Sequence, residues 1–240
     1  MFYTSHFQIG FSHIGFCNLI SNSGILSILE ETAGSHSSSV GYGLNDIPIT
    51  HVSWAILNWK VKVFKRPKYL DKVIVKTWAR EKNKLFCYRD FEVYDENNNL
   101  LIIATSKWIF LDTEKNSIMK IDDSFYEKYK PEKKLVFGMV DIPKPIEPEL
   151  SKKTFEYIVK RSDIDINGHM HNTNYLNLAY EALPEEIYRN KIFDNFEILY
   201  KKEIKLNDTV KFLYSEEENI HTVTIKSLDD KILHTIVKLF

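Results

Sequence analysis

Residues 19–39 read LISNSGILSILEETAGSHSSS, and their pattern indicates the central element of the first half of the chain. Its apolar side chains recur at helical spacing, so that one stripe contains Ile25, Leu26, Ile28, Leu29 and Ala33. A serine or asparagine at 21–23 is a suitable N-cap. The stretch therefore predicts a buried helix.

From Val52 onward the pattern changes to strands rich in Val, Ile, Trp and Phe. The predicted strands are 54–64, 72–80, 84–94 and 100–111. A proline-marked turn and an Asn-rich loop separate neighbouring strands, as expected for hairpins. One helix followed by antiparallel strands indicates an α+β fold.

The second half repeats this order after a proline-interrupted stretch at 121–153, which we expect to be a linker. The predicted elements there are a strand at 155–160, a helix at 173–188 and strands at 193–205, 209–215, 220–226 and 231–240.

An internal repeat is visible at an offset of 150 residues, from Ser12 to Ser162, where Glu31 meets Glu181. It predicts two units, 1–120 and 154–240. We expect each unit to wrap a curved antiparallel sheet around one long helix, and the two units to pair side by side.

Composition excludes several classes of protein. The formal net charge of -1 offers no global field for nucleic acid or an anionic membrane. No apolar run reaches the roughly 20 residues needed to span a bilayer, and the first residues do not resemble a secretory signal. We therefore expect a cytoplasmic protein. Cys17 and Cys87 lack metal or redox spacing and are interpreted as small core residues.

The two copies differ most at the loop before the helix. Asp165, Asn167 and His169 occur only in the second copy, where the first has glycine, cysteine and leucine. At steps of two in an extended segment, the three side chains would share one face, with Ile164 and Ile166 on the other. A carboxylate, an amide and an imidazole can orient water, move a proton and stabilise an oxyanion, which indicates a hydrolytic site.

Two other interpretations fit the same loop. Asp165 could cap a turn while His169 is merely exposed. His169, His171 and Asp165 could instead ligate zinc, although the sequence has no further ligand cluster. We expect no metal and no cofactor.

The segment 161–175, RSDIDINGHMHNTNY, together with YKKEI at 200–204, resembles the acyl-acyl-carrier-protein (acyl-ACP) thioesterase family. Similar motifs occur in the first half, including EETAGSH at 30–36 and SKW at 106–108. The resemblance covers nearly the whole chain. It implies a double hotdog fold, with an acyl-chain slot in the N-terminal unit and a catalytic loop in the C-terminal unit.

The resemblance also implies that Asp165, Asn167 and His169 are catalytic, and that Glu203 is an acidic residue beside them. Plant members carry a cysteine after that glutamate, whereas this chain has Ile204. An isoleucine cannot form an acyl-enzyme, so we expect water to attack the thioester directly.

The implied partners are a fatty acyl thioester and the acyl carrier protein, with a homodimer left open. An acidic carrier would need basic docking residues, and the candidates are Lys60, Lys62, Lys65, Arg66, Lys68, Lys82, Lys84, Lys201 and Lys202. Two alternatives are an acyl-CoA thioesterase, because the loop pattern also resembles smaller enzymes of that kind, and a non-catalytic acyl-chain binding protein. The second would not need Asp165, Asn167 and His169 together.

Overall fold

A computed structural model describes residues 1–83, 85–115 and 117–240. Its chain forms two compact units, Met1–Ile142 and Pro143–Phe240. Within the described part of the chain, no helix has the length and apolar character required to cross a bilayer.

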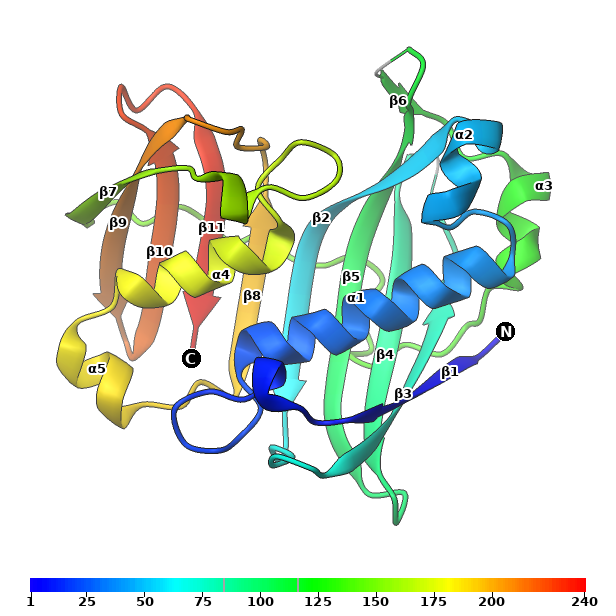
Figure 1. Ribbon diagram of the computed structural model, residues 1–240, viewed down its shortest axis with the longest axis horizontal. Helices are drawn as coiled ribbons and strands as arrows, with labels where there is room; N and C mark the ends of the chain where they lie inside the picture. Colours follow the sequence, from blue (N-terminus) through cyan, green and yellow to red (C-terminus); the bar gives the residue numbers. More distant parts are fainter. Residues whose placement is uncertain (84, 116) are drawn as a thin grey trace. The chain divides into compact units, whose positions relative to one another are not determined.

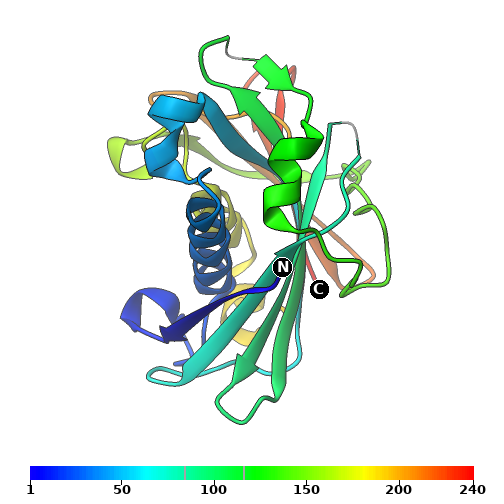
Figure 2. The same ribbon diagram turned by 90° about the vertical axis from the view of Figure 1, so that its right-hand side faces the viewer.

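The first unit is an antiparallel sheet with one long helix on a face of it (Figures 1 and 2). The strands are β1 (Tyr3–Gln8), β2 (Val52–Val63), β3 (Lys72–Ala79), β4 (Cys87–Asp95), β5 (Leu100–Asp112) and β6 (Ser117–Met119). The helices are η1 (Phe11–His13), α1 (Asn22–Ser39), η2 (Leu44–Asp46), α2 (Ile47–Thr50), α3 (Asp123–Tyr126) and η3 (Glu127–Tyr129). The sheet order is β1-β3-β4-β5-β2, and β6 pairs with the end of β5.

Helix α1 confirms the helical prediction. The Ser21 side chain accepts a hydrogen bond from the backbone N–H of Gly24, so Ser21 is the N-cap. Ile25 and Leu29 are fully buried, as are Trp59 and Phe91 from the sheet. Burial of each such side chain contributes about 1.5–3 kcal/mol, so this apolar contact holds the helix on the sheet.

The second unit repeats the layout. Its strands are β7 (Lys152–Ile158), β8 (Asn195–Tyr200), β9 (Thr209–Glu217), β10 (Ile220–Ser227) and β11 (Leu233–Leu239), in the order β7-β9-β10-β11-β8. Its helices are η4 (Arg161–Asp163), α4 (Asn172–Glu181) and α5 (Glu185–Asn190).

Several predicted boundaries differ from the structure, and one strand lies outside the predicted elements. The helix expected at 173–188 ends at Glu181, because Pro184 has no N–H to continue it. The strand expected at 193–205 ends at Tyr200, and a turn follows. Strand β1 was not predicted, although β7, its counterpart in the repeat, was. Of the strand expected at 84–94, residue 84 lies outside the described residues, and β4 begins at Cys87.

The stretch expected to be a linker begins as part of the first unit. Ile121, Tyr126 and Tyr129 are buried in a cluster with Phe110. Further along, Arg80 donates hydrogen bonds to the carbonyl oxygens of Met139 and Val140 at 2.8 and 2.5 Å. These contacts hold the segment up to Ile142 against the first unit.

The loop before the long helix has the same hydrogen bonds in both units. The N–H of Gly15 donates to Leu19 O at 2.9 Å, and that of Asp165 donates to His169 O at 2.8 Å. Likewise Ile20 N donates to Pro67 O, and Met170 N to Ile204 O. Pro67 and Ile204 therefore occupy equivalent places, and so do the residues that precede them.

Candidate active site

The polar loop of the second unit is a tight turn and not an extended segment. Asp165 N donates to His169 O at 2.8 Å, and Gly168 N donates to Asp165 O at 3.1 Å. Gly168 has a φ of +77°, which a residue with a side chain rarely adopts. The predicted arrangement, with polar side chains on one face of an extended segment and isoleucines on the other, is therefore wrong. Ile166 lies at the tip of the turn and is 74% exposed.

The turn nevertheless brings the predicted polar groups together. One carboxylate oxygen of Asp165 accepts the backbone N–H of Asn167 at 2.8 Å and that of His169 at 3.4 Å. The other accepts a hydrogen bond from the Asn167 side-chain amide at 3.3 Å. Asp165 thus caps the turn, as the structural interpretation expects, and also holds the amide and the backbone of His169 in place.

A second turn, formed by Lys201–Asp208, lies against this loop. Met170 N donates to Ile204 O at 2.8 Å, and His169 forms an antiparallel bridge with Lys205. This pairing places Glu203 next to the loop that carries His169. The structure therefore brings the fourth predicted site residue to the other three.

Glu203 is held ionised by its surroundings. Partial burial raises the pKa of its carboxyl, but the Lys202 ammonium, a backbone N–H and the charge of His169 outweigh that effect, so the pKa lies below its usual range. The Lys202 ammonium lies 3.0 Å from the carboxylate, which is 39% exposed. A carboxylate so placed can accept a proton from water or stabilise a charged imidazole.

Helix α4 starts directly after the loop, at Asn172, as expected. His171 is its N-cap: Nδ1 accepts from Thr173 N at 3.4 Å and lies 2.8 Å from the Thr173 hydroxyl. His171 is thus engaged at the helix, and the positive end of the helix dipole points toward the loop. Among the described residues, no three His, Cys, Asp or Glu side chains are grouped so that they could hold a metal ion.

Two tyrosines near the loop were missed by the sequence reasoning. The Tyr175 hydroxyl accepts a hydrogen bond from Ile204 N at 3.1 Å, and the Tyr200 hydroxyl donates to Asn172 O at 3.0 Å. The signal was present, because Tyr175 meets Ile25 at the repeat offset, a change from apolar to polar.

In the first unit the place of Glu203 is taken by Arg66. Its guanidinium donates to Ile20 O and to the Asn22 side chain, each at 2.8 Å. Arg66 thus links the turn of the first unit to the start of α1. The equivalent residue of the second unit, Glu203, carries a carboxylate instead.

The cysteines have different surroundings. Cys87 is buried, and burial raises the pKa of its thiol to about 12. Cys17 is exposed, so its interpretation as a core residue is wrong. It lies in the exposed loop before α1 of the first unit.

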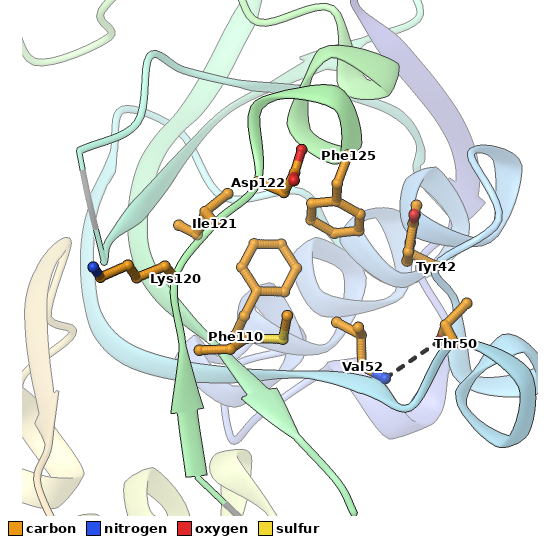
Figure 3. Close-up of a pocket in the computed structure, with 9 residues that line it drawn as sticks. Tyr42, Thr50, Val52, Phe110, Lys120, Ile121, Asp122 and Phe125 are labelled. Atoms are coloured by element: carbon orange, nitrogen blue, oxygen red, sulfur yellow. Dashed lines mark hydrogen bonds between the residues drawn. The ribbon is translucent and has the colours of Figure 1, made fainter.

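The first unit contains an apolar pocket of about 210 Å³ (Figure 3). The rings of Phe110 and Phe125, with centroids 4.4 Å apart, form part of its wall. The remaining lining residues are Tyr42, Thr50, Val52, Met119, Lys120, Ile121 and Asp122. Of the four tryptophans, Trp54 packs on Phe110 at 3.7 Å between ring centroids, whereas Trp59 and Trp78 are wholly buried core residues.

The fold, with a helix on an antiparallel sheet in each unit, is similar to that of solved structures of thioesterases. An acyl-ACP thioesterase from Bacteroides thetaiotaomicron VPI-5482 superimposes with a TM-score of 0.88, covering 100% of this chain and 97% of that one at 23% identity. The 12:0-ACP thioesterase from Umbellularia californica gives 0.82, with 99% and 96% coverage at 17% identity.

The family follows from the sequence match. Residues 1–129 match the acyl-ACP thioesterase N-terminal domain, and residues 146–236 match the C-terminal domain of the same family. The chain belongs to the acyl-ACP thioesterase family.

Curated relatives are plant proteins. The oleoyl-acyl carrier protein thioesterase of Coriandrum sativum is 25% identical over 84% of this chain and 59% of its own length. The oleoyl-acyl carrier protein thioesterase 2 of Arabidopsis thaliana is 24% identical over 80% and 57%. The chain spans somewhat more than half the length of these relatives.

Proposed function

We propose that this protein hydrolyses fatty acyl-ACP thioesters by direct attack of water, releasing a free fatty acid and the carrier protein. One observation carries the proposal: Asp165, Asn167, His169 and Glu203 lie on two adjoining turns of one unit, while the equivalent turns of the other unit lack all four. Family membership supports the same reaction.

In the proposed mechanism His169 and Glu203 carry out the proton transfers. His169 accepts a proton from the attacking water, either directly or by way of Glu203, and the resulting imidazolium then protonates the leaving thiolate. The Asn167 amide and the N-terminal end of α4 face the thioester oxygen as it becomes negative. Asp165 keeps Asn167 and His169 in position. Ile204 stands where a nucleophilic cysteine would be required, so no acyl-enzyme is part of the mechanism.

We further propose that the two units are tandem hotdog folds and that the pocket beside Phe110 and Phe125 receives the acyl chain. An apolar pocket with few polar groups at its edge is the usual form of such a site. Lys201 and Lys202 lie on the same turn as Glu203 and are exposed, which suits an acidic carrier protein. Lys84, another docking candidate, lies outside the described residues. The cytoplasmic location and the homodimer stay predictions.

Steady-state hydrolysis of matched acyl-ACP and acyl-CoA thioesters tests the function. We expect release of fatty acid with a clear preference for the carrier-protein substrate, unchanged by EDTA. A preference for acyl-CoA would favour the acyl-CoA thioesterase, and binding without release of fatty acid would favour the acyl-chain binding protein.

A further inference from the structure

The two copies hold their turns in different ways, and the difference concerns the residues around Glu203. In the first unit, Arg66 itself ties the turn to the helix start through Ile20 O and Asn22. In the second unit, a carboxylate at that place cannot donate these hydrogen bonds. Some other group has to hold the turn.

The next residue in the turn differs as well. The first unit has Pro67, which has no N–H. The second has Ile204, whose backbone N–H is buried with its fully buried side chain and therefore needs an acceptor. The helix residue that binds this N–H also differs between the copies: Tyr175 in α4 stands where α1 has Ile25 at the repeat offset.

Tyr175 is well placed to be this acceptor. It is 3% exposed, and its hydroxyl oxygen lies 3.1 Å from Ile204 N. Its ring packs edge-on against Tyr200, with centroids 5.3 Å apart, and the Tyr200 hydroxyl binds Asn172 O at the first residue of α4. Two tyrosines therefore connect the turn to the helix start, which Arg66 does alone in the first unit.

The charges of both proposed catalytic carboxylates act on this hydroxyl. Burial, and in addition the negative charges of Glu203 and Asp165, raise the pKa of Tyr175, so it stays protonated. It retains an O–H while accepting from Ile204.

We propose that Tyr175 is the positioning residue of the thioester site: by accepting the Ile204 N–H it holds the turn that presents Glu203 to His169. In the first unit the link is made by the turn residue Arg66, whereas in the second unit it is made by the helix residue Tyr175. Glu203 is left available for chemistry. This role rests on the proposed function, because only hydrolysis would require Glu203 and His169 to keep a set separation.

The main test is Tyr175→Phe, which removes only the hydroxyl. We expect kcat for acyl-ACP to fall about ten- to a hundredfold, the scale of a small misplacement of a catalytic group, with KM nearly unchanged. Tyr214→Phe is the matched control, since it removes another tyrosine hydroxyl of the same unit, bonded to Glu216 and His221. It should keep wild-type kcat.

Adding Ile204→Pro to Tyr175→Phe separates positioning from other roles. Proline removes the N–H that lost its acceptor and restores the arrangement at Pro67. We expect it to recover most of the lost kcat. A double variant as slow as the single one, or a single variant with wild-type kcat, overturns the positioning role.

Hydrogen exchange at the Ile204 amide gives a readout that does not depend on activity. We expect its protection to drop in Tyr175→Phe while the amides of β9 and β10 are unaffected. Unchanged protection would overturn the proposal even if the double variant failed to fold. Absence of acyl-ACP hydrolysis by the unaltered protein would instead refute the proposed function. The exchange experiment would still test the hydrogen bond between Ile204 and Tyr175.

Discussion

The backbone N–H of Met170 donates a hydrogen bond to the carbonyl oxygen of Ile204 at 2.8 Å. Each residue directly follows a proposed catalytic one along the chain, His169 and Glu203 respectively. A single backbone contact therefore joins the two turns that carry the imidazole and the carboxylate, and it recurs between Ile20 and Pro67 in the first unit, where neither group is present.

Replacing His169 by alanine should lower turnover by roughly two to four orders of magnitude, because a positioned acid–base group is lost. Asp165→Asn should act in the same direction, since it weakens the hydrogen bonds that shape the turn. Steady-state acyl-ACP hydrolysis measures both, with circular dichroism to verify folding. His6→Ala, at an exposed position of β1 in the first unit, is the control and should behave as wild type. Near-normal turnover of His169→Ala would leave the loop a purely structural turn.

Glu203→Gln should reduce turnover sharply while binding of a fluorescent fatty acid persists. The amide keeps the shape but cannot accept a proton. As an exposed partner of Lys202 alone, Glu203 would contribute about 1 kcal/mol or less to stability and little to the rate. Glu217→Gln, another exposed acid of this unit, serves as comparison. If Glu203→Gln turned over at the wild-type rate, Asp165 and His169 would have to activate the water alone.

Thiol-blocking reagents should leave hydrolysis largely unchanged. Cys17 is exposed and should react, but it belongs to the first unit's loop, and the buried Cys87 thiol has a pKa raised to about 12. Mass spectrometry of the treated protein, together with its residual activity, checks this. An acyl adduct on either cysteine during turnover would refute direct attack by water.

Narrowing the proposed acyl pocket with Val52→Phe should shift the chain-length preference toward shorter substrates. One methylene in an apolar pocket is worth about 1–3 kcal/mol, so kcat/KM for the longest accepted chain should fall at least about tenfold. A panel of acyl-ACP chain lengths measures the shift. Ile49→Phe enlarges an 81% exposed neighbour that does not line the pocket and should leave the profile unaltered. An unchanged chain-length profile in Val52→Phe would mean that the acyl chain binds elsewhere.

Stability should decline as pH falls below about 6.5. Burial, together with the nearby Arg89 charge, lowers the pKa of His36 to about 3, so folding keeps this imidazole neutral. Between that value and its ordinary pKa of about 6.5, the unfolded chain binds one more proton at this residue, which costs up to about 1.4 kcal/mol per pH unit. Denaturant unfolding at several pH values should show this slope, and His36→Gln, which retains an acceptor for Arg89, should flatten it. Equal slopes in both proteins would mean that His36 does not cause the decline.

The local features of the chain can be predicted from its residues. The apolar stripe that forms α1, the cap at Ser21, the strands β2 to β5 and the Asn-rich hairpin after Asp95 all follow from periodicity and turn chemistry within a few residues. Comparison of the two copies also identifies the polar residues of the second loop, because a position with a purely structural role should have similar residues in both copies.

Only the tertiary structure decided how those polar residues are arranged. Asp165 and His169 close a turn instead of lining a strand, because the loop is held by its own hydrogen bonds from Asp165 N to His169 O and from Gly168 N to Asp165 O, and Ile166 is left exposed. The bond between Tyr175 and Ile204 joins residues 29 positions apart. No local pattern encodes such a pair, since its free energy arises only when burial deprives the Ile204 N–H of water and leaves the Tyr175 hydroxyl as its acceptor.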